Sequence, residues 1–140
     1  WGHSVINPNG PECFCGKNGC VSTYISGTGL EEMIYKNLKI KVSAEKFLSQ
    51  PRHSNDEKNI LHEFYEYYGL SLANIINTID PDIIILGGGL SNHQDLYTKG
   101  LEMVYKNIFC EEPNTPILQN VLGDSAGVIG AAIIGKNYGY

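Results

Sequence analysis

The sequence predicts an α/β fold, and three observations indicate it. A long segment carries apolar side chains at helical spacing, a short unbroken apolar run follows it, and three consecutive glycines end that run. Helical and strand-like segments follow the glycines, an order typical of an α/β domain. We expect a single domain, because 140 residues are enough for one modest core.

The amino-terminal part predicts a loop and then two short helices. From Trp1 to Cys20, glycine, proline, asparagine and cysteine dominate without sustained periodicity, which is typical of an ordered loop. A short helix is expected between Ser22 and Leu38, with Ser26 or Thr28 as its start signal. A second short helix is expected from Ser43 to Ser49, capped by its first serine.

The longest helix is expected from about Asn55 to Ile79. Its apolar residues form one stripe, at steps that are mostly three or four: Leu61, Phe64, Tyr68, Leu72, Ile75, Ile76 and Ile79. The segment Asp80-Pro81-Asp82 breaks this helix, which is a more ordinary role for its carboxylates than general-base catalysis. The run from Ile83 to Leu86 is continuously apolar, so we expect a strand covered on both faces.

Three further elements are expected after the glycines. A helix is marked by Leu96, Tyr97, Leu101, Val104 and Ile108. A short strand is expected near Ile117 to Leu122, and a helix of small residues from about Ser125 to Ile134. His53 and His62 are expected to face solvent without a role in a site.

Composition and charge limit the classes of function. The formal net charge is -5, and lysine and arginine form no stripe, which argues against nucleic acid as a partner of this segment. No apolar run approaches the roughly 20 residues that a membrane span needs. The first residues do not resemble a signal peptide, and the absence of Met at position 1 suggests a truncated chain.

One imidazole and three thiols lie close together in the sequence: His3, Cys13, Cys15 and Cys20. This is the donor set of a closed tetrahedral zinc site. Disulfides suit the pattern less well, because pairing within the cluster would leave one thiol over, and a reducing, cytoplasmic compartment is therefore expected. The alternative is a set of ordinary free thiols beside a surface histidine.

Four segments carry a resemblance to a known family. They are Cys13–Cys20 with Gly2-His3 before it, Tyr24–Gly29, Ile79–Asn92 and Gly123–Ala132. The first resembles the Cys-x-Cys-Gly-x-x-Gly-Cys zinc motif of the ROK family of sugar kinases and related repressors, and the others continue the resemblance. It implies the C-terminal, ribonuclease-H-like lobe of the hexokinase, actin and Hsp70 type. Within that lobe, residues 1–21 would form the zinc-binding loop, and residues 22–140 the helical and α/β part.

The resemblance also implies roles for single residues. In the family the motif histidine binds zinc and contacts a sugar hydroxyl, so His3 is expected to do both. A glutamate usually stands two residues after the last cysteine, where this chain has Ser22. A hydroxyl accepts weaker hydrogen bonds than a carboxylate, so ordinary glucose-type recognition is not expected to carry over unchanged.

The run Gly87-Gly88-Gly89 follows a predicted strand, and a tight turn explains it as well as a ligand does. The resemblance implies that these glycines lie beside the adenosine and phosphates of ATP, which binds with Mg²⁺ in the whole protein. Gly127 and its neighbours are expected to pack against the same turn. The family's Asn-Asp pair with the general base and its Asp-x-Gly-Gly-Thr phosphate turn do not occur here, so the chain is expected to be inactive alone.

The function that the resemblance implies is that of an ATP-dependent hexose kinase. The details Ser91-Asn92 and Leu96-Tyr97 favour the branch of fructokinases and N-acetylglucosamine kinases, with fructokinase preferred. Besides sugar and ATP, the expected partner is the rest of its own chain or a second copy, either of which would cover an open strand edge. The alternatives are the effector-binding lobe of a sugar-responsive repressor and a purely structural or regulatory lobe, the latter suggested by Ser22.

Overall fold

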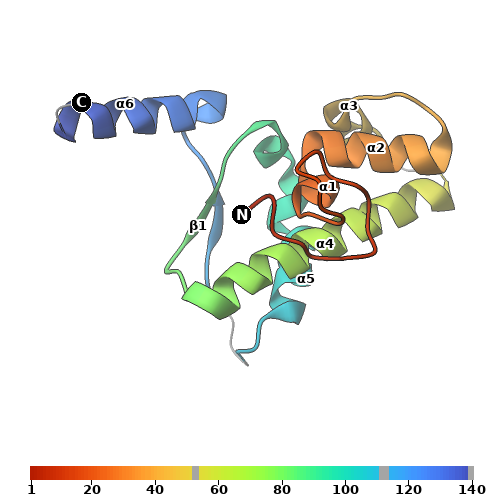
Figure 1. Cartoon of the computed structure of the whole chain (residues 1–140), viewed down its shortest axis with the longest axis horizontal. Helices are drawn as coiled ribbons and strands as arrows, with labels where there is room; N and C mark the ends of the chain where they lie inside the picture. The colour runs from red at the N-terminus through yellow and green to blue at the C-terminus, as the bar shows by residue number, and fades with distance from the viewer. Residues whose placement is uncertain (52–53, 111–113, 139–140) are drawn as a thin grey trace.

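The computed structural model describes residues 1–51, 54–110 and 114–138. Figure 1 shows a helical body with the amino-terminal loop lying against it, and beside it two strands, the second of which leads toward the carboxyl-terminal helix. The α-helices are α1 (Ser22–Ile25), α2 (Gly27–Leu38), α3 (Ala44–Ser49), α4 (Asn55–Ile79), α5 (Lys99–Asn107) and α6 (Ala126–Tyr138). The strands are β1 (Ile84–Leu86) and β2 (Ile117–Gln119), and the 3-10 turns are η1 (Gly89–Asn92), η2 (Gln94–Tyr97) and η3 (Gly123–Ser125).

Helix α4 has the predicted bounds, and its first turn explains where it starts. The Ser54 hydroxyl accepts a hydrogen bond from the Glu57 backbone N–H at 3.1 Å, and the Glu57 carboxylate accepts one from the Ser54 N–H at 3.0 Å. This reciprocal capping satisfies two backbone donors that the helix itself cannot. At its other end α4 stops at Asp80, whose φ of 44° is left-handed.

The predicted helix between Ser22 and Leu38 is two helices, because Ser26 interrupts it. Ser26 has an extended backbone, and its hydroxyl donates to the Ser22 carbonyl at 2.6 Å and accepts from the Gly29 N–H at 3.0 Å. Ser26 is therefore the start signal of α2, as expected, whereas Thr28 lies inside the helix. The serine cap of α3 at Ser43 is also confirmed.

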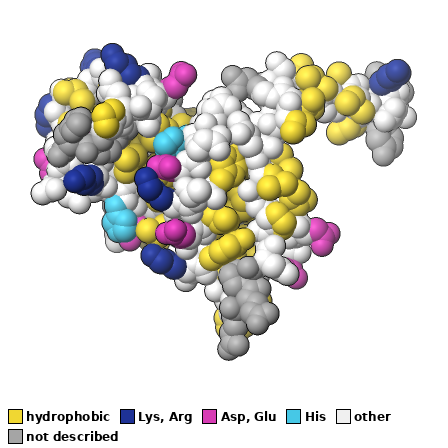
Figure 2. Space-filling model, turned by 180° about the vertical axis from the view of Figure 1, so that it is seen from behind, with side chains coloured by type: hydrophobic (Ala, Val, Ile, Leu, Met, Phe, Trp, Pro, Cys, Tyr) yellow, Lys and Arg dark blue, Asp and Glu magenta, His cyan; other side chains and the backbone are white. Residues whose placement is uncertain are grey.

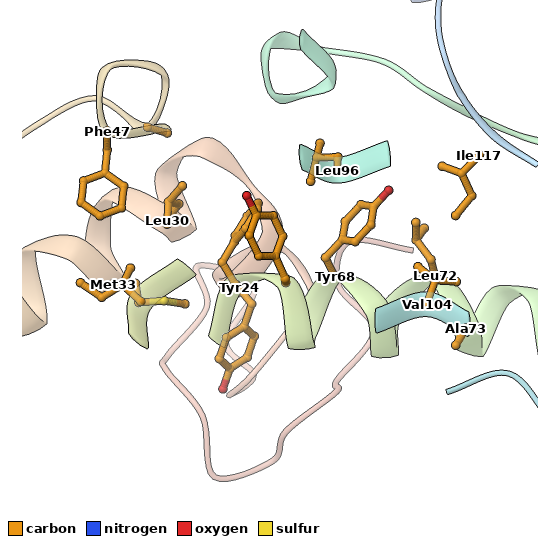
Figure 3. Close-up of a cluster of buried hydrophobic side chains, with 14 of the residues drawn as sticks. Tyr24, Leu30, Met33, Phe47, Tyr68, Leu72, Ala73, Leu96, Val104 and Ile117 are labelled. Atoms are coloured by element: carbon orange, nitrogen blue, oxygen red, sulfur yellow. The ribbon is translucent and has the colours of Figure 1, made fainter. Parts of the chain in front are cut away.

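The apolar side chains of α4 organise the core. Phe64, Tyr68, Leu72 and Ile76 of the predicted stripe are buried, but Ile79 is 67% exposed. Figure 3 shows side chains from α1, α2, α3, η2, α5 and β2 gathered along α4: Tyr24, Leu30, Met33, Phe47, Leu96, Val104 and Ile117. The core thus lies between α4 and the short elements around it.

The sheet is a parallel pair in which Ile84 lies opposite Ile117 and Leu86 opposite Gln119. The prediction that the first strand is covered on both faces is wrong. Ile84, Leu86 and Ile117 pack against the core, whereas Ile85 and Leu118 on the other face are 54% and 48% exposed. An apolar run in the sequence does not reveal whether one or both faces of a strand are covered. Among the described residues, only one face of β1 is covered.

Two further expectations differ from the structure in detail. Leu96 and Tyr97 belong to the 3-10 turn η2 rather than to the helix that follows, and the second strand ends at Gln119 rather than Leu122. His62 is exposed in α4, where its Nε2 lies 3.4 Å from the Glu66 carboxylate. His53 lies outside the described residues.

Helix α6 extends away from the helical body in Figure 1. The expectation that Gly127 packs against the glycine turn is wrong, since a Cβ at Gly127 would meet no atom within 4 Å. Figure 2 shows hydrophobic side chains on the surface of this region, and the exposed ones on α6 are Val128, Ile129, Ile133 and Ile134. None of the helices in the described ranges is both long and apolar enough to cross a membrane.

The contact between α4 and α5 yields a prediction that opposes helix propensity. Alanine usually stabilises a helix relative to glycine by up to about 1 kcal/mol. At Gly69, however, a Cβ would lie 2.6 Å from the Met103 Cβ and 2.5 Å from its carbonyl carbon. We expect Gly69→Ala to lower the free energy of unfolding by about 1–3 kcal/mol, measured by urea denaturation.

Gly130→Ala is the matched control, because a Cβ there would meet no atom within 4 Å. It should be neutral or stabilising. A Gly69→Ala protein as stable as the parent would contradict the close approach of the two helices.

Candidate functional site

The amino-terminal loop folds back on itself so that its two ends lie together. Antiparallel bridges join Val5 to Cys20 and Glu12 to Asn18. The Gly19 carbonyl accepts from the Ile6 N–H at 2.8 Å. Gly19 has a left-handed φ of 63°, and a Cβ there would collide with the carbonyl oxygen of Asn7. Only glycine fits this crossing of two backbone segments.

The four predicted metal ligands meet inside this loop. The donor atoms of His3, Cys13, Cys15 and Cys20 all lie within 4.8 Å of one another. The His3 Nδ1 is 3.5 Å from the Cys13 Sγ, and the Cys15 and Cys20 Sγ atoms are also 3.5 Å apart. Ligands of a tetrahedral zinc are separated by roughly 3.5–3.8 Å, given bond lengths of about 2.0–2.3 Å. The residues therefore fit a metal ion, and Cys110 is exposed elsewhere.

The thiols of this cluster have unequal acidities. A hydrogen bond from the Cys15 backbone lowers the pKa of the Cys13 thiol to about 6. Burial raises the pKa of the Cys20 thiol to about 11. A bound cation would favour the thiolate at both positions, because its charge stabilises the deprotonated sulfur.

Asn7 holds the loop against the helical body. Its side-chain amide donates to the Tyr67 hydroxyl of α4 at 2.9 Å and to the Tyr24 hydroxyl of α1 at 3.1 Å. The two tyrosine rings stack, with centroids 3.6 Å apart. Sequence analysis missed Asn7, because its partners are 17 and 60 residues away and no local pattern predicts such contacts.

Ser22 and His3, the two predicted sugar contacts, both lie close to Cys13. The Cys13 Sγ is 3.5 Å from the His3 Nδ1 and 3.9 Å from the Ser22 Oγ. Ser22 lines an open groove of about 900 Å³ between the loop, α2 and α4. Phe14, which is 91% exposed, also lines it and meets the His3 ring edge-on at 4.8 Å. The structure thus brings both residues beside Cys13, but of the two only Ser22 lines the groove.

The three glycines after β1 form an exposed turn. Gly88 has a left-handed φ of 80°, and a Cβ on any of the three would meet no atom within 4 Å. Among the described residues, no acceptor is found for the backbone N–H of Gly87, Gly88 or Gly89. The turn therefore presents open backbone donors, which suits close approach by an anionic ligand.

The segment after this turn is tied to α4. The Tyr65 hydroxyl lies 2.7 Å from the His93 Nε2 and donates to the Asp95 carboxylate at 3.4 Å. The Lys99 ammonium donates to the same carboxylate at 2.6 Å, and this contact holds the Asp95 pKa below its usual value. The segment after the glycine turn and the amino-terminal loop are thus each attached to α4, by Tyr65 and Tyr67 respectively.

Comparison with known proteins identifies the family of this chain. A family profile described as "ROK family" matches residues 1–137. The chain belongs to the ROK family. It is 37% identical over 126 residues to an N-acetyl-D-glucosamine kinase of Histophilus somni, a match that covers 88% of this chain and 41% of the relative. An N-acetyl-D-glucosamine kinase of Pasteurella multocida is 33% identical with the same coverage.

Solved ROK structures share the fold. A ROK hexokinase from Thermus thermophilus superposes with a TM-score of 0.78 at 27% identity, over 94% of this chain and 46% of that one. A ROK glucokinase from Streptomyces griseus, in complex with glucose and AMPPNP, gives 0.80 at 23% identity, over 97% and 50%. The chain thus spans less than half the length of these curated relatives. Both of these relatives are named N-acetyl-D-glucosamine kinases, whereas the sequence analysis preferred fructokinases.

The amino-terminal loop yields a prediction whose control lies three residues away in the sequence. Gly16 and Gly19 both have positive φ, but a Cβ at Gly16 would meet no atom within 4 Å. Gly16→Ala should lower the free energy of unfolding by only about 1–2 kcal/mol, the strain of a positive φ at a residue with a Cβ. Gly19→Ala should cost more, because the loop must also open at Asn7. Urea denaturation of both variants measures the difference, and equal losses would contradict the crossing.

Proposed function

We propose that this chain is the C-terminal lobe of an ATP-dependent kinase that phosphorylates N-acetyl-D-glucosamine. The observation that carries the proposal is the convergence of His3, Cys13, Cys15 and Cys20 within 4.8 Å, in a chain of the ROK family. The sugar class comes from the named relatives. The whole protein would act in the cytoplasm.

In this proposal the cluster holds a structural zinc ion, which orders a loop that has no core of its own. Metal binding supplies about 10–16 kcal/mol of apparent folding energy in small zinc modules. The His3 Nδ1 faces Cys13, so the other ring nitrogen is left for a sugar hydroxyl. The metal would orient His3, and Ser22, whose hydroxyl is 3.9 Å from the Cys13 Sγ, would contact the sugar as well.

Elemental analysis tests the metal site. We expect one zinc per chain in the purified parent protein. After dialysis against a chelator, the His3→Ala and Cys15→Ser variants should have lost this zinc. Cys110→Ser is the matched control, because this exposed thiol lies outside the cluster and its removal should leave the zinc content unchanged. A folded protein without zinc would remove the main support for this site.

The glycine turn is the proposed contact for the adenosine and phosphates of ATP, with Mg²⁺ bound alongside. Its support is the three backbone donors without acceptors and the open space above them. The general base and the phosphate turn would come from the rest of the protein, so we propose that these 140 residues are inactive alone. The exposed apolar residues of β1, β2 and α6 would then be covered by that part or by a second copy.

A kinase assay of the full-length protein tests the activity and the role of Ser22 together. We expect ATP-dependent phosphorylation of N-acetyl-D-glucosamine in preference to fructose. Ser22→Glu should lower the KM for the sugar about tenfold, because a carboxylate accepts roughly twice as strong a hydrogen bond as a hydroxyl.

Thr28→Glu is the control, since it adds the same charge to the same groove away from Cys13. It should leave the KM unchanged. If neither the parent protein nor Ser22→Glu binds sugar, the lobe is structural or regulatory instead.

A repressor that senses a sugar is the second proposal, because the family includes repressors with the same metal motif. The segment before this lobe discriminates the two. An Asp-x-Gly-Gly-Thr turn there would favour the kinase, and a helix-turn-helix without that turn would favour the repressor. The open glycine donors favour the kinase.

A further inference from the structure

The Asn120 side chain contacts residues on both sides of the glycine turn. Asn120 follows β2, and its backbone N–H donates to the Leu86 carbonyl at 3.0 Å. Its side-chain amide donates to the same carbonyl at 3.0 Å and to the Ser91 hydroxyl oxygen at 3.2 Å. Leu86 is the last residue before the three glycines, and Ser91 comes two residues after them. Asn120 is thus bonded to both ends of the turn.

The chain of hydrogen bonds continues into the turn itself. The Ser91 hydroxyl donates to the Gly88 carbonyl at 2.7 Å, and the Ser91 N–H donates to the same oxygen at 3.0 Å. Ser91 is 3% exposed, and its own carbonyl accepts from the Tyr97 hydroxyl at 2.7 Å. Each hydroxyl or amide in such a series polarises the next, which strengthens the series as a whole.

The orientation of the Asn120 amide follows from its partners. The Leu86 carbonyl can only accept, so the NH₂ group must face it, and the amide oxygen points the other way. That oxygen is buried and has no partner among the described residues. A buried acceptor left unsatisfied costs stability, and an apolar side chain would avoid this cost. The unsatisfied oxygen gives no stabilisation that would account for an amide side chain at this position. The two hydrogen bonds that the NH₂ group donates do account for it.

Those two bonds act where the backbone is least constrained. Three glycines in a row have more conformational freedom than any other three residues, and Gly88 is held at φ 80° and ψ 172°. Ordering one backbone residue costs roughly 1–2 kcal/mol. Anchors at Leu86, Gly88 and Ser91 order the turn before any ligand arrives, and a ligand then loses less binding energy to that ordering.

We propose that Asn120 is a positioning residue for nucleotide binding, which fixes the open N–H groups of the glycine turn through Leu86 and Ser91. The inference rests on the proposed function, because it takes the turn to be the nucleotide site. In this proposal Asn120 acts through these two residues and not by contact with the nucleotide, since its NH₂ group is bonded to Leu86 and Ser91 and its oxygen is buried.

The test uses Asn120→Asp in the full-length protein, because this change keeps the shape of the side chain and replaces the donor with an acceptor. The dissociation constant for ADP, measured by calorimetry, should rise about tenfold, whereas the KM for the sugar should stay the same. In the absence of nucleotide, amide hydrogen exchange should accelerate in a peptide that covers residues 84–91 and remain unchanged over α4. Ser91→Ala should weaken ADP binding likewise, and the double variant no further than either single one.

Gln119→Ala is the matched control. Gln119 is the last residue of β2 and directly precedes Asn120. Its amide donates to the Asn92 side chain at 2.9 Å, and Asn92 lies beyond both Ser91 and the three glycines. ADP binding should be unchanged in this variant.

Three results would overturn the inference. If Asn120→Asp binds ADP as tightly as the parent protein does, the hydrogen bonds from Asn120 to Leu86 and Ser91 have no role in nucleotide binding. If exchange accelerates throughout the chain, or if Gln119→Ala weakens ADP binding equally, the effect is general loss of stability. If the parent protein itself binds no ADP, the proposed function fails, and the inference fails with it.

Discussion

Burial of the apolar face of α4 is the constraint on which the other elements depend. Phe64, Tyr68 and Leu72 are nearly inaccessible, and side chains from both the amino-terminal and the carboxyl-terminal elements pack against them. The other helices of this core are short, and isolated helices of fewer than about 12 residues are marginal in water. Their order therefore comes from contact with α4 rather than from their own propensity. This explains how a small lobe maintains two separate loops in defined shapes.

The amino-terminal loop is held by a different kind of interaction, because it has almost no apolar interior. Its order comes from backbone crossings at Gly19, from the Asn7 amide and from the cluster of three sulfur atoms and one imidazole. Such a loop can present an exposed imidazole in a fixed position without a core beneath it. The groove beside it is open, and polar side chains such as Ser22 and Thr28 line it together with aromatic and aliphatic ones.

Local signals predicted most of the elements and the metal cluster, and long-range contacts account for what was missed. The α4 stripe, the serine caps at Ser26 and Ser43 and the cysteine spacing are all visible within a few residues of sequence. The exposed face of β1 was not predictable, because the same run of isoleucines is compatible with a strand covered on one face or on both. Asn7 and Asn120 were missed for a related reason, since an asparagine in a loop carries no sign of a distant partner.

The two tyrosines that attach the loops are two residues apart on one helix. The Tyr67 hydroxyl accepts a hydrogen bond from Asn7 of the amino-terminal loop, and Tyr65 contacts His93 just beyond the glycine turn. A helix rises about 1.5 Å per residue, so these attachment points are about 3 Å apart along its axis and are turned to different sides. Both loops are consequently fixed to the same helix. Rotation of this lobe about a hinge would carry both loops together and preserve the spacing between them.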